Sequence, residues 1–365
     1  MALSAPLQQI DRVFVLYRGR KLIYFGGCDY FRLSSHPKVL RALKEGAQKF
    51  GLNVAASRST TGNHVLFEKL EEELANFFRV ERAALLSNGY ATNLAVTQTF
   101  ASQFTHAVID ERCHGSPRDA AQLLRCPVLT FAHRDVKDFR RVLKTCGRSA
   151  RPFVLTDGMF SHDGSLAPLR EYLDALPRTA MLLVDDAHGA GTLGKTGRGT
   201  VEVCGVRDSR VVQTISLSKA FGVYGGAVLG SAKVITEIQE HSRIFNGNTP
   251  LPLPLANAAL TSVKILKQDH RLRVRLNSNT ARLKGALRSV DCGTADNDSP
   301  LVTIVPGTPR DASSLSGKLL RAGIFPSLIS YSGGQCRYYF RFAVSSEHSS
   351  AQLDQLAEVL IEFLH

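Results

Sequence analysis

Four short apolar runs, each ending in polar residues, limit most strongly what this chain of 365 residues can fold into. They are HAVIDE (106–111), PFVLTDG (152–158), AMLLVDDAHG (180–189) and VVQTISLSK (211–219). Segments with helical patterning lie between these strand-like runs. Strands that alternate with helices predict a mostly parallel central sheet that is covered by helices on both faces. We therefore expect an α/β fold.

The helical patterning is clearest over residues 64–79, HVLFEKLEEELANFFR. The spacing places Leu66, Leu70, Leu74 and Phe77 on one face of a helix, with acidic residues opposite. A second helix, SAKVITEIQEHSRIF, is expected after the last of the four apolar runs. Both segments have the amphipathic pattern of helices that pack on a sheet.

The pattern changes at NGNTPLPLPLANAAL (246–260), where prolines interrupt it before a long helical stretch that continues to about residue 287. Beyond it, the sequence predicts a strand, a helix, a strand and a final helix, at residues 299–307, 313–324, 336–344 and 349–364. We expect an N-terminal segment, a large domain and a smaller α+β C-terminal domain, at residues 1–40, 41–245 and 246–365.

Composition favours a protein of a reducing, aqueous compartment. No apolar run approaches the length that crosses a bilayer, and the first residues lack the basic and apolar blocks of a signal peptide. The seven cysteines are scattered, with no CxxC pair and no spacing typical of a metal site. We expect a cytoplasmic protein that binds neither a membrane nor a metal ion.

The formal charge of +13 leaves several classes of anionic partner open. Nucleic acid, an anionic membrane and a phosphate-bearing small molecule would each suit a basic chain. The one basic helical stretch, RLRVRLNSNTARLKGALR (271–288), lacks the interleaved aromatic residues of a single-strand-binding surface. We interpret it as a solvated helix face and expect no nucleic-acid partner.

The polar residues at the ends of the four runs point to a common site. Ligands of parallel sheets bind beyond the carboxyl ends of the strands, so Asp110, Asp157, Asp185, His188 and Lys219 are expected to converge there. A lysine, a carboxylate and an imidazole at neighbouring strand ends are what pyridoxal phosphate requires. The amine condenses with the aldehyde, and the carboxylate keeps the pyridine nitrogen protonated so that the ring accepts electrons.

A phosphate group also needs hydrogen-bond donors, and the stretch SNGYATN (87–93) offers them. It follows an apolar run and precedes a helical segment. A glycine-containing turn at the start of a helix presents backbone N–H groups and a favourable dipole to an anion. In combination with the lysine and the carboxylate, it favours a pyridoxal phosphate site.

From about Tyr24 to its end, the chain resembles the α-oxoamine synthases, a branch of the fold type I pyridoxal phosphate enzymes. The motifs that carry the resemblance occur in the family's order. They are CDYFRLSSHP (28–37), SRSTTGNHVLFEKLE (57–71), SNGYATN (87–93), DERCHGS (110–116), DGMFSHDGSLAPL (157–169), VDDAHGAGTLGKTGRG (184–199), SLSKAFG (216–222) and FRFAVSSEHS (340–349).

The resemblance implies catalytic and ring-binding roles for four residues. Lys219 corresponds to the lysine that forms the Schiff base and later removes the Cα proton. Asp185 corresponds to the partner of the pyridine nitrogen, and His188 to the residue near the phenolic oxygen. His114 corresponds to the histidine that stacks on the cofactor ring. Without the family pattern, His114 would be interpreted as a surface or capping histidine.

The remaining cofactor contacts are implied in the same way. Gly89 and Tyr90 correspond to the turn over the phosphate, and Ser161 and Ser216 to hydroxyl positions near the cofactor. Thr249 corresponds to a hydroxyl that reaches the phosphate of the neighbouring subunit. The family therefore implies a homodimer with its active site at the subunit interface.

Substrate binding is implied for Arg341, which corresponds to the arginine that grips the amino-acid carboxylate, and for His64, near the entrance. Three positions depart from the family pattern or lack a clear counterpart in it. Cys28 replaces a common asparagine, His162 stands where methionine is usual, and Arg12 is the candidate for an arginine that some relatives use for the acyl tail. These positions bear on which substrates the site accepts.

The resemblance implies a decarboxylative condensation of an amino acid with an acyl thioester, which yields an α-amino ketone. The match is best to members that join L-alanine to a pimeloyl group on coenzyme A or an acyl carrier protein, giving 8-amino-7-oxononanoate for biotin synthesis. A glycine C-acetyltransferase or a serine palmitoyltransferase-like enzyme is the alternative within the family. An inactive regulatory subunit of the same fold is the non-enzymatic alternative. An aminotransferase would not explain the His114 and SRSTTGNH matches so well.

Overall fold

The computed structural model describes residues 5–290, 295–329 and 338–365, so Cys292, Cys336 and the first residues of the strand expected at 336–344 lie outside it. The chain forms two compact units. The larger comprises His36–Ser161 and Leu166–Asp269. The smaller comprises Met1–Ser35, His162–Ser165 and His270–His365.

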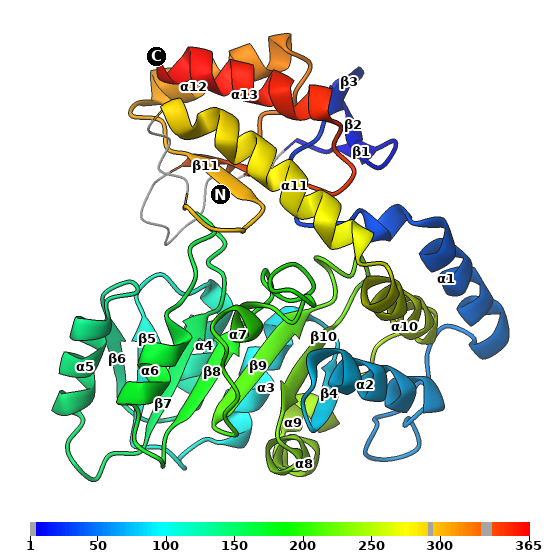
Figure 1. The fold of residues 1–365 in the computed structure, drawn as a ribbon. Coiled ribbons are helices and arrows are strands. Elements are labelled where there is room, and N and C mark those ends of the chain that lie inside the picture. The colour runs from blue at the N-terminus through cyan, green and yellow to red at the C-terminus, as the bar shows by residue number, and fades with distance from the viewer. Residues whose placement is uncertain (1–4, 291–294, 330–337) are drawn as a thin grey trace. The chain divides into compact units, whose positions relative to one another are not determined.

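The larger unit is built on a seven-stranded sheet with the order β4-β10-β9-β8-β7-β5-β6 (Figure 1). Its strands are β4 (Arg82–Leu86), β5 (His106–Asp110), β6 (Val128–Phe131), β7 (Pro152–Asp157), β8 (Met181–Asp185), β9 (Val211–Ser216) and β10 (Gly226–Gly230). Strands β5 to β9 are parallel to one another, whereas β10 runs antiparallel to both β9 and β4. The predicted α/β fold is confirmed, and the four apolar runs are β5, β7, β8 and β9.

Helices cover both faces of this sheet, because successive residues of each strand point to opposite sides. Leu155 of β7 and Leu183 of β8 belong to one buried cluster with residues of α3 (Gly89–Thr99), α4 (Gly115–Leu123) and α8 (Ala232–His241). Val154 and Leu182, their neighbours in the chain, belong to the other cluster, with residues of α5 (Val136–Thr145) and α6 (Leu169–Ala175). The sheet is therefore buried on both sides, and its carboxyl edge is left for function.

The other helices of the larger unit are α1 (Pro37–Phe50), α2 (Val65–Phe78), α7 (Thr200–Val203), α9 (Arg243–Asn246) and α10 (Leu253–Gln268). Helix α2 is the helix predicted at 64–79, and its predicted apolar face is buried. Helix α10 packs on α1 and α2. For this reason residues 246–269 cluster with the larger unit, whereas the sequence-based boundary was expected at 245.

The long helix expected up to residue 287 is two helices, α10 and α11 (Arg271–Ala286). Asp269 ends α10 with backbone angles of −99° and 82°, outside the helical range. Aspartate is a poor residue for a helix interior because its side chain competes for backbone hydrogen bonds. The break coincides with the limit between the two units.

The described residues of the smaller unit form two three-stranded sheets. The first contains β1 (Gln8–Gln9), β2 (Phe14–Tyr17) and β3 (Arg20–Ile23), and the second has the order β11-β13-β12. The second sheet is formed by β11 (Leu301–Ile304), β12 (Leu328–Ile329) and β13 (Tyr339–Ala343). The helical elements are the short 3-10 turns Leu33–Ser35 and Leu287–Ser289, with α11, α12 (Pro309–Arg321) and α13 (Ser350–Leu364).

One buried histidine of the smaller unit is held neutral by its surroundings. The ring of His348 stacks on Phe25 at 4.0 Å between centroids, and its Nδ1 lies 3.0 Å from the backbone N–H of Ser345. Its Nε2 lies 3.2 Å from the carbonyl oxygen of Tyr24. Burial, aided by the charge of Arg32, lowers the pKa of His348 to about 3. The neutral ring therefore links the segment after β3 to the segment before α13.

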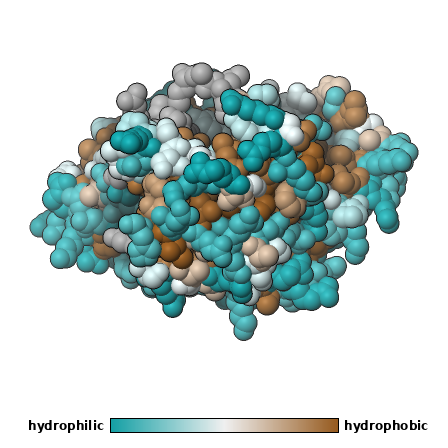
Figure 2. All heavy atoms as spheres, turned by 90° about the horizontal axis from the view of Figure 1, so that it is seen from above, coloured by the Kyte–Doolittle hydropathy of each residue, from teal (hydrophilic) through white to brown (hydrophobic). Residues whose placement is uncertain are grey.

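Basic side chains of α11 form ion pairs and hydrogen bonds within the smaller unit, although several of them are exposed to solvent. Arg275 pairs with Glu347 at 3.2 Å, and Arg282 pairs with Asp354 at 2.7 Å. Lys284 donates to the carbonyl oxygens of residues 295 and 297. On the face drawn in Figure 2, hydrophilic side chains are spread among hydrophobic ones. Within the described residues, no helix is long and apolar enough to cross a membrane.

Candidate active site

Two carboxylates meet at the carboxyl edge of the central sheet. Asp157 ends β7 and Asp185 ends β8, and the two residues are paired in the parallel register. Paired positions of adjacent strands project to the same face of a sheet. Both side chains therefore lie on the face covered by α3 and α4, where they are almost completely buried.

Asp185 is held in place by an asparagine that the sequence interpretation did not single out. The Nδ2 of Asn93, on α3, donates to Oδ2 of Asp185 at 2.7 Å and to Oγ of Ser116 at 2.9 Å. The Oδ1 of Asn93 accepts a hydrogen bond from Thr214 on β9 at 2.6 Å. The backbone N–H of Ala187 donates to the other carboxylate oxygen of Asp185 at 3.1 Å. These bonds fix the carboxylate at the sheet edge.

Asp157 interacts with several of the groups that are expected to hold the cofactor. Burial raises the pKa of the Asp157 carboxyl well above its ordinary value, and the neighbouring Asp185 raises it further. The backbone N–H of His114, 3.2 Å away, and the charge of Lys219 act in the opposite direction. Asp157 therefore interacts with three of the four residues for which a catalytic role is predicted.

Lys219 lies in the turn that follows β9, three residues beyond the end of the strand, and its side chain is half-buried. The turn is closed by a hydrogen bond of 2.9 Å from the N–H of Gly222 to the carbonyl oxygen of Lys219. Leu217, Ala220 and Phe221 are fully buried around it. The apolar neighbours anchor the turn and leave the lysine at the carboxyl edge.

The predicted phosphate turn forms the start of α3. Asn88 caps the helix by accepting from the N–H of Ala91 at 2.9 Å. A Cβ atom on Gly89 would lie 2.8 Å from Cβ of Ser216, and one on Gly226 would lie 2.6 Å from the backbone of Asn88. Only glycine allows such close packing. The turn therefore abuts the end of β9, where Ser216 was expected to lie.

His114 and Tyr90 are neighbours on this side of the sheet. His114 caps α4, with its Nδ1 accepting from the N–H of Ser116 at 3.2 Å. Its ring lies 6.3 Å from that of Tyr90, whose hydroxyl bonds to Asp119. The capping role is the one expected for a histidine at such a position without the family pattern. It does not conflict with a role of the ring face.

His188 belongs to a loop that is organised by Asp186. The Asp186 carboxylate accepts from the N–H and hydroxyl of Thr200 and from Nε2 of Gln213, each at 2.8 Å. A Cβ on Gly189 or Gly199 would lie about 2 Å from this carboxylate. Burial raises the pKa of Asp186 to about 6, although the hydrogen bonds from Thr200 and Gln213 oppose the shift. The two adjacent aspartates thus act on opposite faces of the sheet.

Asp110 does not join the cluster, contrary to the expectation from its strand-end position. Its carboxylate accepts from the N–H of Arg134 at 2.9 Å and lies 3.0 Å from Nδ1 of His133. His133 packs against Phe160, which belongs to the cluster on the other face of the sheet. The side chain of Asp110 therefore points away from α3 and α4.

The other predicted site residues of the larger unit differ in their burial and contacts. Ser161 is buried just beyond β7. Thr249 is exposed in the segment before α10. His64 caps α2 through a hydrogen bond of 3.2 Å from the N–H of Leu66, and its ring packs against Phe50 and Phe67. The contacts of His64 account for its position without a substrate.

Arg341 belongs to the smaller unit, where it lies on β13, the middle strand of its sheet. Its Nη2 lies 3.7 Å from the sulfur of Cys28. His162 packs near Tyr339, and its carbonyl oxygen accepts from Thr303. Cys28 and Arg341 are therefore direct neighbours.

Arg12 is also in the smaller unit. It forms an ion pair of 2.8 Å with Glu347 and donates to the carbonyl oxygens of Phe31 and Arg32. These bonds engage its guanidinium inside the unit.

The class I and II aminotransferase family matches residues 20–360 of the chain. An 8-amino-7-oxononanoate synthase of Thioalkalivibrio sulfidiphilus is 35% identical over 360 residues, which cover 98% of this chain and 90% of that protein. The 8-amino-7-oxononanoate synthase 1 of Bacillus subtilis is 30% identical over 97% of this chain and 91% of that protein.

Solved structures of related enzymes match the chain over nearly its whole length. Serine palmitoyltransferase of Sphingomonas wittichii matches with a TM-score of 0.91 at 27% identity, over 98% of this chain and 90% of that one. An 8-amino-7-oxononanoate synthase of Francisella tularensis matches with a TM-score of 0.80 at 26% identity, over 93% and 97%. The chain belongs to the α-oxoamine synthases, a branch of the class I and II aminotransferases. It is a pyridoxal phosphate-dependent C-acyltransferase.

The residues at the sheet edge fit the cofactor of an α-oxoamine synthase. Pyridoxal phosphate requires an amine for its aldehyde, an anion for its ring nitrogen and N–H donors for its phosphate. One unit contains a group of each kind: the amine of Lys219, the buried and hydrogen-bonded carboxylate of Asp185, and the N–H groups at the start of α3. The absence of a Cβ on Gly89 allows the close approach of backbone to ligand that a phosphate site needs.

Proposed function

We propose that this enzyme condenses L-alanine with a pimeloyl thioester, with loss of carbon dioxide, to give 8-amino-7-oxononanoate for biotin synthesis. The observation that carries the proposal is the 35% identity to an 8-amino-7-oxononanoate synthase over 98% of the chain. The acyl carrier is coenzyme A or an acyl carrier protein. The surplus positive charge suits either polyanionic carrier.

When bound, pyridoxal phosphate supplies an electron sink for a carbanion at Cα of the amino acid. The amine of Lys219 would hold the cofactor through its aldehyde and, when free, would take the proton from Cα of the amino acid. Asp185, oriented by Asn93, holds a proton on the ring nitrogen. His188 would contact the phenolic oxygen of the bound cofactor, and His114 would contact its ring.

The phosphate is held by the start of α3, with Gly89 and Tyr90, and the hydroxyls of Ser161 and Ser216 complete the set around the cofactor. Arg341 binds the carboxylate of the amino acid through its planar fork of donors. His64 lines the entrance. Residues 41–245 are proposed as the cofactor-binding domain, and residues 246–365 as the small domain, preceded by an N-terminal segment at 1–40.

We also propose that the enzyme is a homodimer in which Thr249 reaches the phosphate bound by the partner subunit. The exposure of Thr249 supports this proposal, because a hydroxyl that acts on another subunit must lie at the surface of its own. The cytoplasmic location stays a prediction. Light scattering of the purified protein tests the dimer, and a monomeric, fully active enzyme would contradict it.

The alternative within the family is a serine palmitoyltransferase-like reaction, which the TM-score of 0.91 to a solved serine palmitoyltransferase favours. Identity to that structure is 27%, compared with 35% to an 8-amino-7-oxononanoate synthase. Cys28, next to Arg341, is the chain's own departure in the proposed carboxylate pocket. An inactive regulatory subunit is disfavoured by the presence of Lys219, Asp185 and His188.

The test is a panel of amino acids against acyl thioesters with the purified holoenzyme. L-alanine with pimeloyl-CoA is expected to release coenzyme A and carbon dioxide, and Lys219→Ala is expected to abolish the release. Serine with palmitoyl-CoA or glycine with acetyl-CoA, if either proves the better pair, overturns the substrate assignment and leaves the reaction type standing. No release with any pair overturns both.

A further inference from the structure

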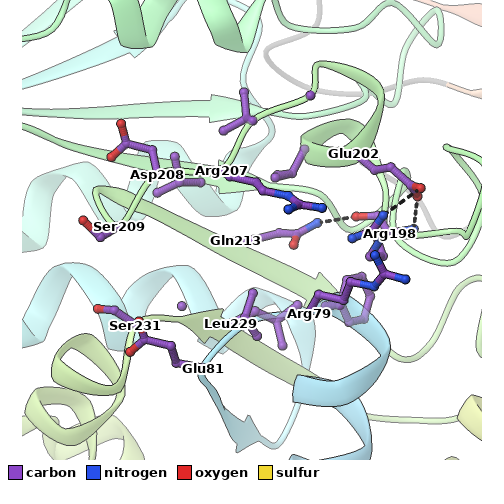
Figure 3. Close-up of a pocket in the computed structure, with 17 residues that line it drawn as sticks. Arg79, Glu81, Arg198, Glu202, Arg207, Asp208, Ser209, Gln213, Leu229 and Ser231 are labelled. Atoms are coloured by element: carbon purple, nitrogen blue, oxygen red, sulfur yellow. Dashed lines mark hydrogen bonds and ion pairs between the residues drawn. The ribbon is translucent and has the colours of Figure 1, made fainter.

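The larger unit contains a pocket, separate from the cluster around Asp185, with a volume of about 390 Å³. It lies over β9 and β10, between the end of α2 and α7 (Figure 3). Its inner wall includes Gln213 and Leu229, which are partners in the β9–β10 register. Gln213 shares the other face of the sheet with Asp186, since the two side chains are hydrogen-bonded. The pocket is therefore on the side of the sheet that does not carry Asn93 and Asp185.

The walls of this pocket combine apolar and cationic groups. Val201, Val206, Val211 and Leu229 give it an apolar lining. Arg79, at the end of α2, and Arg198 and Arg207, on either side of α7, bring three guanidinium groups to it. Figure 3 shows these arginine side chains extending toward the pocket from the two sides. Apolar walls with a few convergent polar groups, in a volume of a few hundred cubic ångströms, are typical of small-molecule sites.

The carboxylates that line the pocket are engaged by protein partners. Glu202 pairs with Arg198 at 3.0 Å. Asp208 pairs with Arg210, which lies outside the pocket, at 2.7 Å. Glu81 accepts from the N–H of Ala232, at the start of α8, at 2.8 Å. Each acidic group therefore has a donor of its own.

Two of the three arginines have no such partner. Within the described residues, the side chains of Arg79 and Arg207 form no hydrogen bond and no ion pair. With Glu202 matched by Arg198 and Asp208 matched by Arg210, these two guanidinium groups face one carboxylate, that of Glu81, already bonded to a helix N-terminus. The pocket thus has more cationic donors than its own anions use.

We propose that this pocket binds a small organic phosphate, with its apolar part against β9 and β10 and its phosphate on Arg79 and Arg207. Two guanidinium forks match the oxygens of a phosphate dianion, and each charge-assisted hydrogen bond contributes more than a neutral one. The site is distinct from the cofactor site, because the two lie on opposite faces of the sheet.

The experiment is calorimetric titration of the holoenzyme with phenyl phosphate at low salt, followed by the visible spectrum to verify that the cofactor stays bound. Phenol and inorganic phosphate serve as probes of the apolar part and of the anion alone. The test variant is the double substitution Arg79→Ala and Arg207→Ala. The matched control is Arg140→Ala with Arg148→Ala, which removes the same charge from exposed positions lining another part of the larger unit.

We expect saturable binding of one phenyl phosphate per chain, at least ~10-fold weaker in the test variant and unchanged in the control, with phenol and inorganic phosphate both binding more weakly. Unaltered melting temperatures would verify that both variants are folded. Equal affinity in the two double variants overturns the proposal. The absence of saturable binding to the wild-type holoenzyme at millimolar phenyl phosphate also overturns it. Neither outcome touches the proposed reaction, which is measured separately.

Discussion

The contact between Asn93 and Asp185 gives the most specific prediction about cofactor binding. Replacing Asn93 by leucine keeps a side chain that branches at Cγ but removes the donor 2.7 Å from Oδ2 of Asp185. Ser116 retains a bond to the carbonyl oxygen of Tyr90, and Thr214 has a second acceptor in the carbonyl oxygen of Val184. Of the three partners of Asn93, the Asp185 carboxylate is therefore the one most affected by the loss of the amide.

The magnitude follows from the kind of bond that is lost. A hydrogen bond to a charged group contributes about 1.5–3 kcal/mol, because burial leaves no water to replace the donor. If the lost hydrogen bond weakens the interaction of the Asp185 carboxylate with the cofactor by this free energy, the dissociation constant for pyridoxal phosphate rises about 10- to 100-fold. The protein also loses some stability, since Asn93 is fully buried.

The assay is equilibrium dialysis of the apoenzyme with pyridoxal phosphate, paired with urea unfolding. Thr97→Val is the matched control. Thr97 is also fully buried on α3, but among the described residues its hydroxyl bonds only to the backbone of Asn93 and Leu94. The control is expected to lose stability with its cofactor affinity nearly unchanged. If Asn93→Leu and Thr97→Val bind the cofactor equally well, Asn93 does not position Asp185.

Three further substitutions test other contacts. Gly89→Ala is expected to weaken cofactor binding at least ~10-fold in the same dialysis assay, because the added Cβ would lie 2.8 Å from Cβ of Ser216; unchanged affinity would mean that the turn is not part of the site. Arg58→Ala should lower the free energy of unfolding in urea by about 3 kcal/mol, since it leaves Glu71 buried without its ion-pair partner; a loss below ~1 kcal/mol would contradict this. His348→Gln should remove a pH dependence: the folded pKa of about 3 lies below the unfolded value, so the unfolded chain binds more protons between these two values, and stability is present above ~pH 6.5 and lost as the pH falls. As the pH rises from 4.5 to 6, the free energy of unfolding of the wild type in urea should therefore increase, relative to that of the variant, by up to ~1.4 kcal/mol per pH unit. Parallel pH profiles of the two proteins would refute the lowered pKa of His348.

The strands that periodicity could predict are those that alternate with helices along the chain. β5, β7, β8 and β9 are all fully or largely buried and rich in valine, leucine and isoleucine, as parallel strands usually are. β10 has the sequence GAVLG and pairs antiparallel between β4 and β9. Its short, glycine-bounded sequence gives a weak strand signal, and a strand–helix alternation does not predict an antiparallel member.

The strand ends also predicted only part of the site. Strand-end positions identified Asp157 and Asp185 correctly as neighbours, but Asp110 ends its strand with the opposite side-chain direction. Ile109, not Asp110, shares the face of Leu155. Because side chains alternate at every residue, a difference of one position in where a strand ends sends the carboxylate to the other face.

Asn93 could not be assigned from the strand ends because it lies inside a helix. Its partners, Asp185 and Thr214, are distant in sequence and meet it only through tertiary packing. The available signal was a polar residue in the motif SNGYATN, at a helical position that is fully buried in the structure. Tertiary packing also determines that α10 belongs to the larger unit, since this helix packs against α1 and α2. The local sequence pattern does not show these contacts.

The most direct test of the account is to find where the cofactor is attached. The holoenzyme is reduced with borohydride, digested, and mapped by mass spectrometry. The account predicts a pyridoxyl group on the Nζ of Lys219 and its loss in Lys219→Ala. A label on another lysine, or none on the peptide that contains Lys219 after reconstitution with pyridoxal phosphate, would contradict it.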